Sequence, residues 1–219
     1  RRAFAKAARD VPQEFVGDEA HRGDMVWSAA VPEELRSRAT AVIGNFPVSQ
    51  ASQYTRLEWL QTFSAGVDAY ICPGVLPRGT MVTNASGAYG QSVSEHMFAT
   101  MWALMKNLNR YASNQRDHQW QDEGPVLSPE GGIALIIGVG DIGSHFAQLA
   151  QSVGMRTFGV RRHADVPAKG IEKMYGFERL EALLPLADVV AMAVPRSPQT
   201  HHLLNADRLG RLKSTAIVI

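Results

Sequence analysis

The fold is decided by Gly138-Val139-Gly140-Asp141-Ile142-Gly143, a glycine-rich turn that directly follows the apolar run Ile133-Ala134-Leu135-Ile136-Ile137. The turn opens a segment in which apolar residues recur with the period of an amphipathic helix. These helix residues are Ile142, Phe146, Leu149 and Val153. A buried strand, a GxGxxG turn and a helix in this order are the context that the dinucleotide-binding fingerprint requires. The stretch therefore predicts a unit that binds a dinucleotide.

Each part of the turn has a separate task in such a site. Gly138 allows the tight turn, Gly140 lets the backbone approach the pyrophosphate, and Gly143 lets helix and strand pack closely. The helix then begins at Asp141 and Ile142, where free N–H groups and the positive end of the helix dipole face the phosphates. The alternative is an ordinary glycine-rich turn between a strand and a helix. The further strand predicted over residues 155–160 favours the dinucleotide site.

The end of that second strand bears on the choice of cofactor. Proteins that bind NAD carry an acidic residue there, about 20 positions beyond the turn, which holds the ribose 2′-OH. Here Val160 is followed by Arg161, Arg162 and His163. An arginine suits a 2′-phosphate, which it can bind with two parallel charge-assisted hydrogen bonds. The sequence predicts NADP(H) in preference to NAD(H). The alternative is that both arginines are solvated loop residues and that NAD(H) binds without the acidic residue.

The order of predicted elements gives the fold class. In residues 1–90, short strand candidates at 15–16, 41–43, 57–63 and 81–83 are separated by helical segments. From Gly131 the alternation restarts, with strands at 133–137, 155–160, 189–194 and 216–219 and helices at 141–153, 178–184 and 206–212. Alternation of this kind predicts α/β architecture with doubly wound parallel sheets. We expect two domains, residues 1–90 and 91–219.

A long helix is predicted near the start of the second domain, over residues 94–118. Its expected cap is Ser94, and its expected apolar stripe is Met97, Met101, Leu104, Leu108 and Tyr111. Asp122-Glu123-Gly124-Pro125 interrupts it, so residues 119–130 are expected to form an irregular arm. The stripe carries more apolar surface than one domain face needs, and closed two-fold dimers are the commonest oligomer, so we expect a homodimer.

Composition excludes several classes of protein. The 219 residues are 45% hydrophobic and 20% charged with a net charge of +1, which does not indicate a nucleic-acid partner. The longest apolar run is far shorter than the roughly 20 residues that cross a bilayer. One cysteine, Cys72, allows no internal disulfide, so a cytoplasmic setting is expected. No metal site is predicted. Cys72 is expected to be buried, and Trp27 and Trp59 are expected to be core aromatics.

Four separated stretches, in this order and spacing, resemble the D-isomer-specific 2-hydroxyacid dehydrogenases. The match covers roughly residues 40–219. The stretches are Leu57-Glu58-Trp59-Leu60-Gln61 with Ser64-Ala65-Gly66-Val67-Asp68, then Thr83-Asn84-Ala85-Ser86-Gly87 with Ser92-Val93-Ser94-Glu95-His96, then Gly138 to Gly143, and finally Ala187-Asp188-Val189-Val190 with Val194-Pro195-Arg196-Ser197-Pro198-Gln199-Thr200 and Leu203-Leu204-Asn205.

The resemblance implies a flavodoxin-like substrate domain over 1–90, a Rossmann domain over 91–219, and hydride transfer between a nicotinamide cofactor and a small 2-oxo or 2-hydroxy acid such as glyoxylate or hydroxypyruvate. It implies that N–H groups of Ala65, Gly66 and Val67 hold the substrate carboxylate. A glycine-containing turn at a strand end exposes adjacent donors of this kind. Ser92, Val194, Pro195 and Thr200 match positions that touch the cofactor, and the long helix and arm match a dimer contact.

By the same resemblance, the catalytic arginine, glutamate and histidine are expected beyond Ile219. No catalytic residue is therefore assigned in this chain, which we expect to be truncated at both ends and inactive as it stands. Glu95-His96 and the other histidines are interpreted as structural or surface residues. The alternative function is a non-catalytic, dinucleotide-sensing binding protein on the same fold, because a fold does not fix a function.

Overall fold

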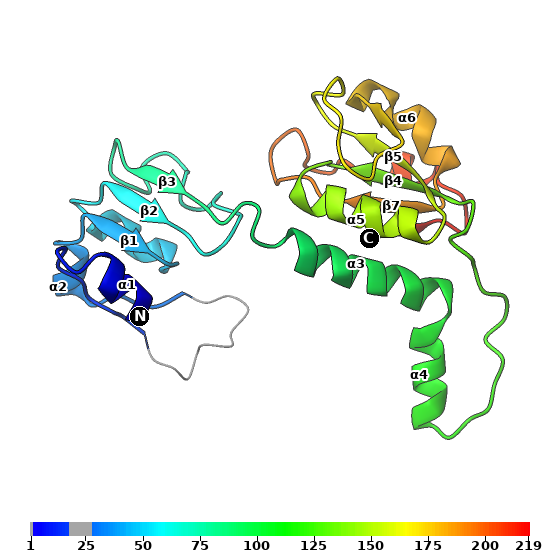
Figure 1. Ribbon diagram of the computed structural model, residues 1–219, viewed down its shortest axis with the longest axis horizontal. Coiled ribbons are helices and arrows are strands. Elements are labelled where there is room, and N and C mark those ends of the chain that lie inside the picture. Colours follow the sequence, from blue (N-terminus) through cyan, green and yellow to red (C-terminus); the bar gives the residue numbers. More distant parts are fainter. Residues whose placement is uncertain (1, 18–27) are drawn as a thin grey trace. The chain divides into compact units, whose positions relative to one another are not determined.

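The computed structural model describes residues 2–17 and 28–219, and the chain divides into two compact units, Arg1–Ser86 and Gly87–Ile219 (Figure 1). Both are built on parallel sheets, so the predicted α/β class is confirmed. Within the described residues, no helix is both long enough and apolar enough to cross a membrane.

Unit 1 contains a three-stranded parallel sheet in the order β1-β2-β3. The strands are β1 (Ala41–Ile43), β2 (Trp59–Gln61) and β3 (Met81–Thr83), and the helices are α1 (Arg2–Ala7), α2 (Glu33–Arg36) and the 3-10 helix η1 (Val48–Gln53). Its core contains Phe46 stacked on Tyr54 at 4.3 Å between ring centroids. Burial raises the pKa of Tyr54 to about 12, so this phenol stays protonated.

Three expectations for unit 1 are wrong. Phe15 and Val16 form no strand, because this two-residue pair has no partner strand among the described residues and Phe15 is exposed. Trp59 is exposed at the sheet surface, where its indole N–H donates to Thr83 Oγ1 at 2.8 Å. Cys72 is exposed as well. Trp27 lies outside the described residues.

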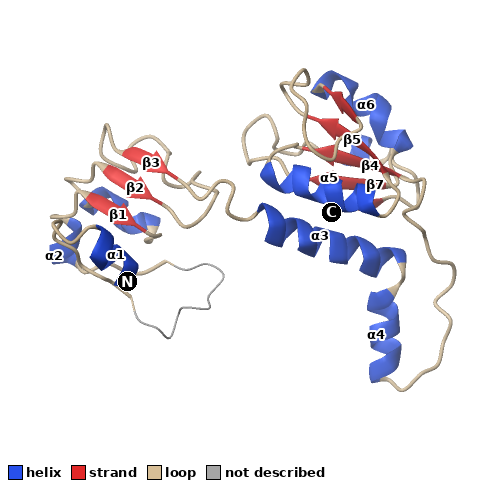
Figure 2. Ribbon diagram, in the orientation of Figure 1, coloured by secondary structure: helices blue, strands red, loops and turns tan. Residues whose placement is uncertain are grey.

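Unit 2 contains a five-stranded parallel sheet in the order β6-β5-β4-β7-β8 (Figure 2). The strands are β4 (Ile133–Ile137), β5 (Arg156–Val160), β6 (Lys173–Tyr175), β7 (Val189–Met192) and β8 (Ile217–Val218). The strand order reverses between β4 and β7. In open α/β sheets such a switch point is where ligands bind, beyond the carboxyl ends of the strands.

Helices cover both faces of this sheet. Ala134 and Ile136 of β4 pack with α3 (Gly90–Met105) and α5 (Asp141–Ser152), which lie side by side in Figure 1. Leu135 and Ile137 point to the other face, where α6 (Leu180–Leu183) packs. This alternation follows from the two-residue period of a strand. The remaining helices are α4 (Leu108–Arg116), η2 (Phe177–Arg179), η3 (Leu184–Leu186) and α7 (Ala206–Leu209).

The single long helix expected over residues 94–118 is instead two helices, α3 and α4. Asn107 separates them with a φ of 54°, in the left-handed region that asparagine tolerates better than most residues. The buried stripe of α3 is Met97, Met101 and Met105, whereas Leu104 and Leu108 are exposed. The expected stripe was wrong beyond Met101 for two reasons. Within α3 the next buried residue is Met105 and not Leu104, and after Asn107 the chain continues in α4, which has no buried residue.

Candidate dinucleotide-binding site

The turn after β4 requires glycine at its first position for two reasons. Gly138 has a φ of 94°, which residues with a side chain rarely adopt. A β-carbon there would also lie 2.5 Å from the carbonyl oxygen of Ala193, after β7. The Gly138 N–H donates to Val160 O at 2.9 Å, which ties the turn to the end of β5. The turn is therefore fixed at the switch point by both neighbouring strands.

Gly143 brings helix α5 against the turn. A β-carbon on Gly143 would lie 2.2 Å from the carbonyl oxygen of Gly138, so only glycine allows this approach. In the described part of the chain, the N–H groups of Asp141, Ile142 and Gly143 donate to no acceptor. Free donors and the helix dipole together suit an anion at this end of α5.

Gly140 differs from the other two glycines of the motif. A β-carbon there would meet no atom of the described chain within 4 Å. Its φ of −99° is negative, so its backbone does not occupy the left-handed region that favours glycine. Neither packing nor conformation within the chain accounts for glycine here. Close approach of a ligand does account for it, so the turn fits a pyrophosphate group.

The first turns of α3 and α5 meet beside this site. A β-carbon on Gly90 would lie 2.3 Å from the Asp141 carboxylate, so the first residues of the two helices are in contact. Ser92 is exposed in the same first turn of α3. Gly90, which is distant in sequence, therefore packs on the first residue of α5, whereas the contact of Ser92 with the cofactor stays a prediction.

The segment after β7 closes the other side of the turn. Val194 Cγ1 would lie 2.8 Å from a β-carbon on Gly138. Thr200 Oγ1 donates to Pro195 O at 2.7 Å and accepts from the Ser197 N–H at 2.9 Å, which holds residues 195–200 in a compact loop. Val194 therefore contacts the turn directly, whereas the side chain of Thr200 is engaged within its own loop.

Arg161 follows β5 on the side where the adenosine of a dinucleotide would lie. Its guanidinium donates to three backbone oxygens: Nε to His163 O at 2.9 Å, Nη1 to Val139 O at 3.4 Å, and Nη2 to Val166 O. Arg162 and His163 are exposed. Arg161 is thus a link between the phosphate turn and the loop after β5, a role that the sequence did not reveal because its partners are backbone atoms.

An open surface pocket of about 480 Å³ lies between the turn, α5 and that loop. Its lining residues are Val139, Gly140, Asp141, Ser144, His145, Gln148, Arg161, Pro167, Ala168 and Lys169. The sequence prediction did not include Ser144, His145, Gln148 or Lys169. Helical spacing from Asp141 could have indicated His145, whereas Lys169 reaches the pocket only through the path of the loop.

The predicted substrate turn belongs to unit 1 and shows a second set of free donors. Its carbonyl groups are used internally: Ser64 O accepts from Thr62 Oγ1, Ala65 O from Asn84 Nδ2 and Gly66 O from Ser64 Oγ, at 2.7–2.8 Å. The N–H groups of Ala65, Gly66 and Val67 donate to no acceptor within residues 2–17 and 28–219. Such a turn can accept an anion.

Within residues 2–17 and 28–219, resolved pKa shifts fall on Tyr54, Tyr70, Arg156 and Glu172, none of which lines the pocket beside the pyrophosphate turn. Tyr70 directly follows the substrate turn, and its N–H donates to Val67 O at 2.8 Å. Among the described residues, no group of three histidine, cysteine, aspartate or glutamate side chains is placed to hold a metal ion.

Known proteins are similar to this chain in both sequence and fold. The chain is 26% identical over 198 residues to a glycerate dehydrogenase of Methylorubrum extorquens, covering 86% of this chain and 60% of that protein. It is 28% identical to a glyoxylate reductase of Pyrococcus horikoshii, covering 75% of this chain and 51% of that protein. The chain thus spans about half to three fifths of the length of these relatives.

A crystal structure of a D-isomer specific 2-hydroxyacid dehydrogenase family protein from Aeromonas salmonicida has a TM-score of 0.76 to this chain at 30% identity. The similarity covers 85% of this chain and 60% of that one. Residues 98–219 match the model of the NAD binding domain of D-isomer specific 2-hydroxyacid dehydrogenases. This match covers more than half of the chain and includes the Gly138–Gly143 turn, so the chain belongs to the D-isomer specific 2-hydroxyacid dehydrogenase family.

Proposed function

We propose that the protein is an oxidoreductase that transfers a hydride between a nicotinamide dinucleotide and a small 2-oxo or 2-hydroxy acid, with D specificity. The observation that carries the proposal is the Gly138–Gly143 turn, in which Gly140 leaves open the space that a pyrophosphate would need. Family membership over residues 98–219 supports the same cofactor class. The bound nicotinamide would supply or accept the hydride.

The substrate side of the proposal rests on unit 1. The N–H groups of Ala65, Gly66 and Val67 would hold the carboxylate of the acid, because the carbonyl groups of Ser64, Ala65 and Gly66 are already engaged. Asn84 and Ser64 would act as positioning residues that keep these donors in place. No residue of 1–219 is assigned to polarise the 2-oxo group or to donate the proton. The names of the relatives favour small acids such as glyoxylate.

We further propose that NADP(H) is preferred over NAD(H). Solved structures of this fold include complexes with NAD and with NADPH, so the fold alone does not choose between them. The proposed preference rests on the residues after β5. Arg161 and Arg162 stand where NAD-binding proteins carry an acidic residue, and such a residue would repel a 2′-phosphate. Three of the five N–H donors of Arg161 are engaged by backbone oxygens, which leaves two for a ligand.

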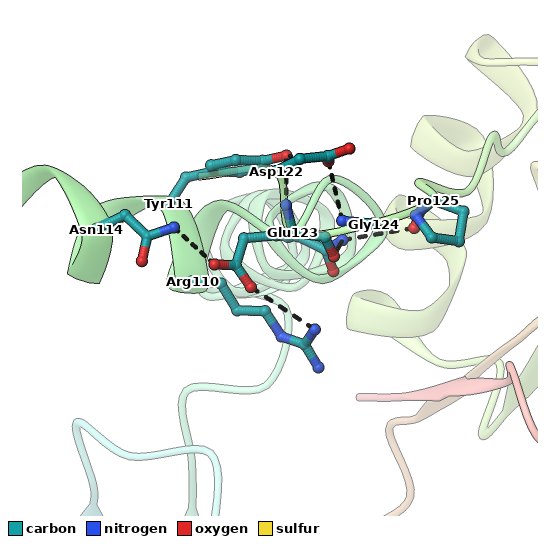
Figure 3. A network of polar contacts seen from close by, with 8 residues as sticks. Arg110, Tyr111, Asn114, Asp122, Glu123, Gly124 and Pro125 are labelled. Atoms are coloured by element: carbon teal, nitrogen blue, oxygen red, sulfur yellow. Dashed lines mark hydrogen bonds and ion pairs between the residues drawn. The ribbon is translucent and has the colours of Figure 1, made fainter. Parts of the chain in front are cut away.

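A homodimer is also part of the proposal, and α4 with the following arm supports it. Figure 3 shows how the arm is held: Asn114 Nδ2 donates to Glu123 Oε1 at 2.6 Å, and the Gly124 N–H donates to the Asp122 carboxylate at 3.0 Å. Trp120 on this arm is fully exposed, and Leu108 on α4 is exposed too. An ordered arm with exposed apolar side chains fits a contact with a second copy. Light scattering that finds a monomer would contradict this part.

The test of the activity uses the natural full-length protein. Oxidation of NADPH and of NADH is followed with glyoxylate and with hydroxypyruvate, and kcat/KM is measured for each pair. We expect turnover with both acids and a higher kcat/KM with NADPH. Dinucleotide binding without turnover of any small 2-oxo acid would contradict the proposal and favour a binding protein. The variant Asn84→Ala removes the amide that donates to Ala65 O. We expect it to raise KM for the acid more than it lowers kcat.

A further inference from the structure

We infer that Lys169 is a specificity residue for the cofactor: its ammonium group contacts the phosphate on the adenosine ribose of NADPH, in the pocket beside the pyrophosphate turn. This inference rests on the proposed dinucleotide function and names a residue that the fingerprint does not contain. The ligand class is an adenosine nucleotide that carries a 2′-phosphate in addition to its 5′-phosphate.

The pocket lies where such a phosphate would be. One wall is Val139, Gly140 and Asp141 of the turn, and the opposite wall is the loop that follows β5. Arg161, at the end of β5, connects the two walls. A dinucleotide with its pyrophosphate on the turn therefore extends its adenosine ribose toward this pocket, because the residue at the end of the second strand is the one that reads the ribose in this fold.

The basic side chains that line the pocket differ in how many contacts they already make within the chain. Arg161 is held by three backbone oxygens, which fixes its guanidinium and occupies more than half of its donors. His145 Nδ1 lies 2.8 Å from Asp141 O and 3.4 Å from the Asp141 carboxylate, so its contacts are local to α5. Lys169 has no hydrogen bond, ion pair or ring contact in the described part of the chain.

The position of Lys169 is determined by the glycine that follows it. Gly170 has a φ of 74°, and a β-carbon there would lie 2.5 Å from the Gln148 nitrogen in α5. The loop is thereby packed closely on α5, and Lys169 lies at the pocket next to this contact. Lys169 on a packed segment and the held guanidinium of Arg161 line the same pocket, and two cations on one pocket suit a dianionic phosphate.

A pair of probes isolates the 2′-phosphate. Adenosine 2′,5′-bisphosphate and adenosine 5′-monophosphate differ only in that group, and their affinities for the 219-residue chain are measured by calorimetric titration. We expect the bisphosphate to bind more tightly. Lys169→Gln should weaken the bisphosphate roughly tenfold, as expected for one charge-assisted contact, and leave the monophosphate unchanged. Lys169→Arg should keep most of the preference.

Lys173→Gln is the matched control, because it removes the same charge from an exposed lysine on β6 that does not line the pocket. It should leave both affinities unchanged. The inference is overturned if Lys169→Gln leaves the bisphosphate affinity unchanged, or if Lys169→Gln and Lys173→Gln weaken it equally. Failure of the proposed dinucleotide site, on which this inference rests, looks different: the unaltered chain would then bind neither NADPH nor NADH.

Discussion

Gly138, Gly140 and Gly143 share one motif but differ in what a β-carbon would meet. At Gly138 and Gly143 it would overlap backbone oxygens, and at Gly140 it would meet open space. The sequence predicted all three because the motif and its flanking strand and helix are local. The engagement of Arg161 could not be predicted, since its acceptors are carbonyl oxygens of Val139, His163 and Val166, and any residue type supplies a carbonyl.

Gly143→Ala should destabilise the chain because the new methyl group would lie 2.2 Å from Gly138 O. Overpacking of this kind typically costs about 1–3 kcal/mol. Urea denaturation measures the loss in the free energy of unfolding. Gly140→Ala is the control and should be as stable as the unaltered chain, because its β-carbon has no neighbour. Equal stability of Gly143→Ala and Gly140→Ala would contradict the packing described for α5.

At the scale of elements, the separation of α3 from α4 is the feature that helical periodicity misses. Periodicity records which residues are apolar, not which single residue adopts a left-handed φ. Asn107 is held there by the arm, since its Nδ2 donates to Glu123 O at 3.2 Å and to Pro125 O at 3.4 Å. These two carbonyl groups come after the chain has reversed its direction, and the amino-acid composition does not reveal that reversal.

Asn107→Ala should lower the free energy of unfolding by roughly 1–2 kcal/mol, because alanine is strained in the left-handed region and lacks the amide. Asn107→Gly relieves the strain but still lacks both hydrogen bonds, so its stability should fall between the two. Thermal unfolding followed by circular dichroism gives this order. If Asn107→Ala proved more stable and more helical than the unaltered chain, α3 and α4 would form one continuous helix, contrary to the structure.

The pairing of β5 with β6 predicts a dependence on pH. Arg156 donates to both Glu172 carboxylate oxygens, at 2.7 and 3.1 Å, and this hydrogen bonding lowers the pKa of Glu172 from 4.5. A lowered folded-state pKa gives stability that is present above pH 4.5 and is lost as the pH falls through the folded-state value.

Glu172→Gln removes this contribution, so the Tm of the variant should lie below that of the unaltered chain at neutral pH and approach it in acid. The effect should be small, because exposed pairs contribute little and are screened by salt. Added salt should narrow the difference at neutral pH. A difference in Tm that stays constant from neutral pH to about pH 3, well below the ordinary glutamate pKa of 4.5, would contradict the assignment to this pair.

At the scale of the whole molecule, unit 2 followed from the sequence more closely than unit 1. Four of its strands were predicted because fully buried parallel strands appear as apolar runs. β6 was missed because Lys173-Met174-Tyr175 is short and mixed, as an edge strand can be. In unit 1 the strands at 41–43 and 81–83 were expected, whereas the exposure of Trp59 and Cys72 was not. Hydrophobicity gives only the average tendency of a residue type to be buried. It does not show whether a neighbouring residue covers a particular side chain.

The turn between β4 and α5 is proposed to bind a nicotinamide dinucleotide, and a titration measures this binding. NADPH and NADH are titrated into the 219-residue chain and into Gly140→Val, with the fold of each checked by circular dichroism and thermal unfolding. We expect the unaltered chain to bind both, NADPH more tightly, and the variant to stay folded but lose at least about tenfold in affinity for both, because its side chain fills the pyrophosphate space. Unchanged affinity in a folded Gly140→Val chain would show that the turn does not hold the dinucleotide.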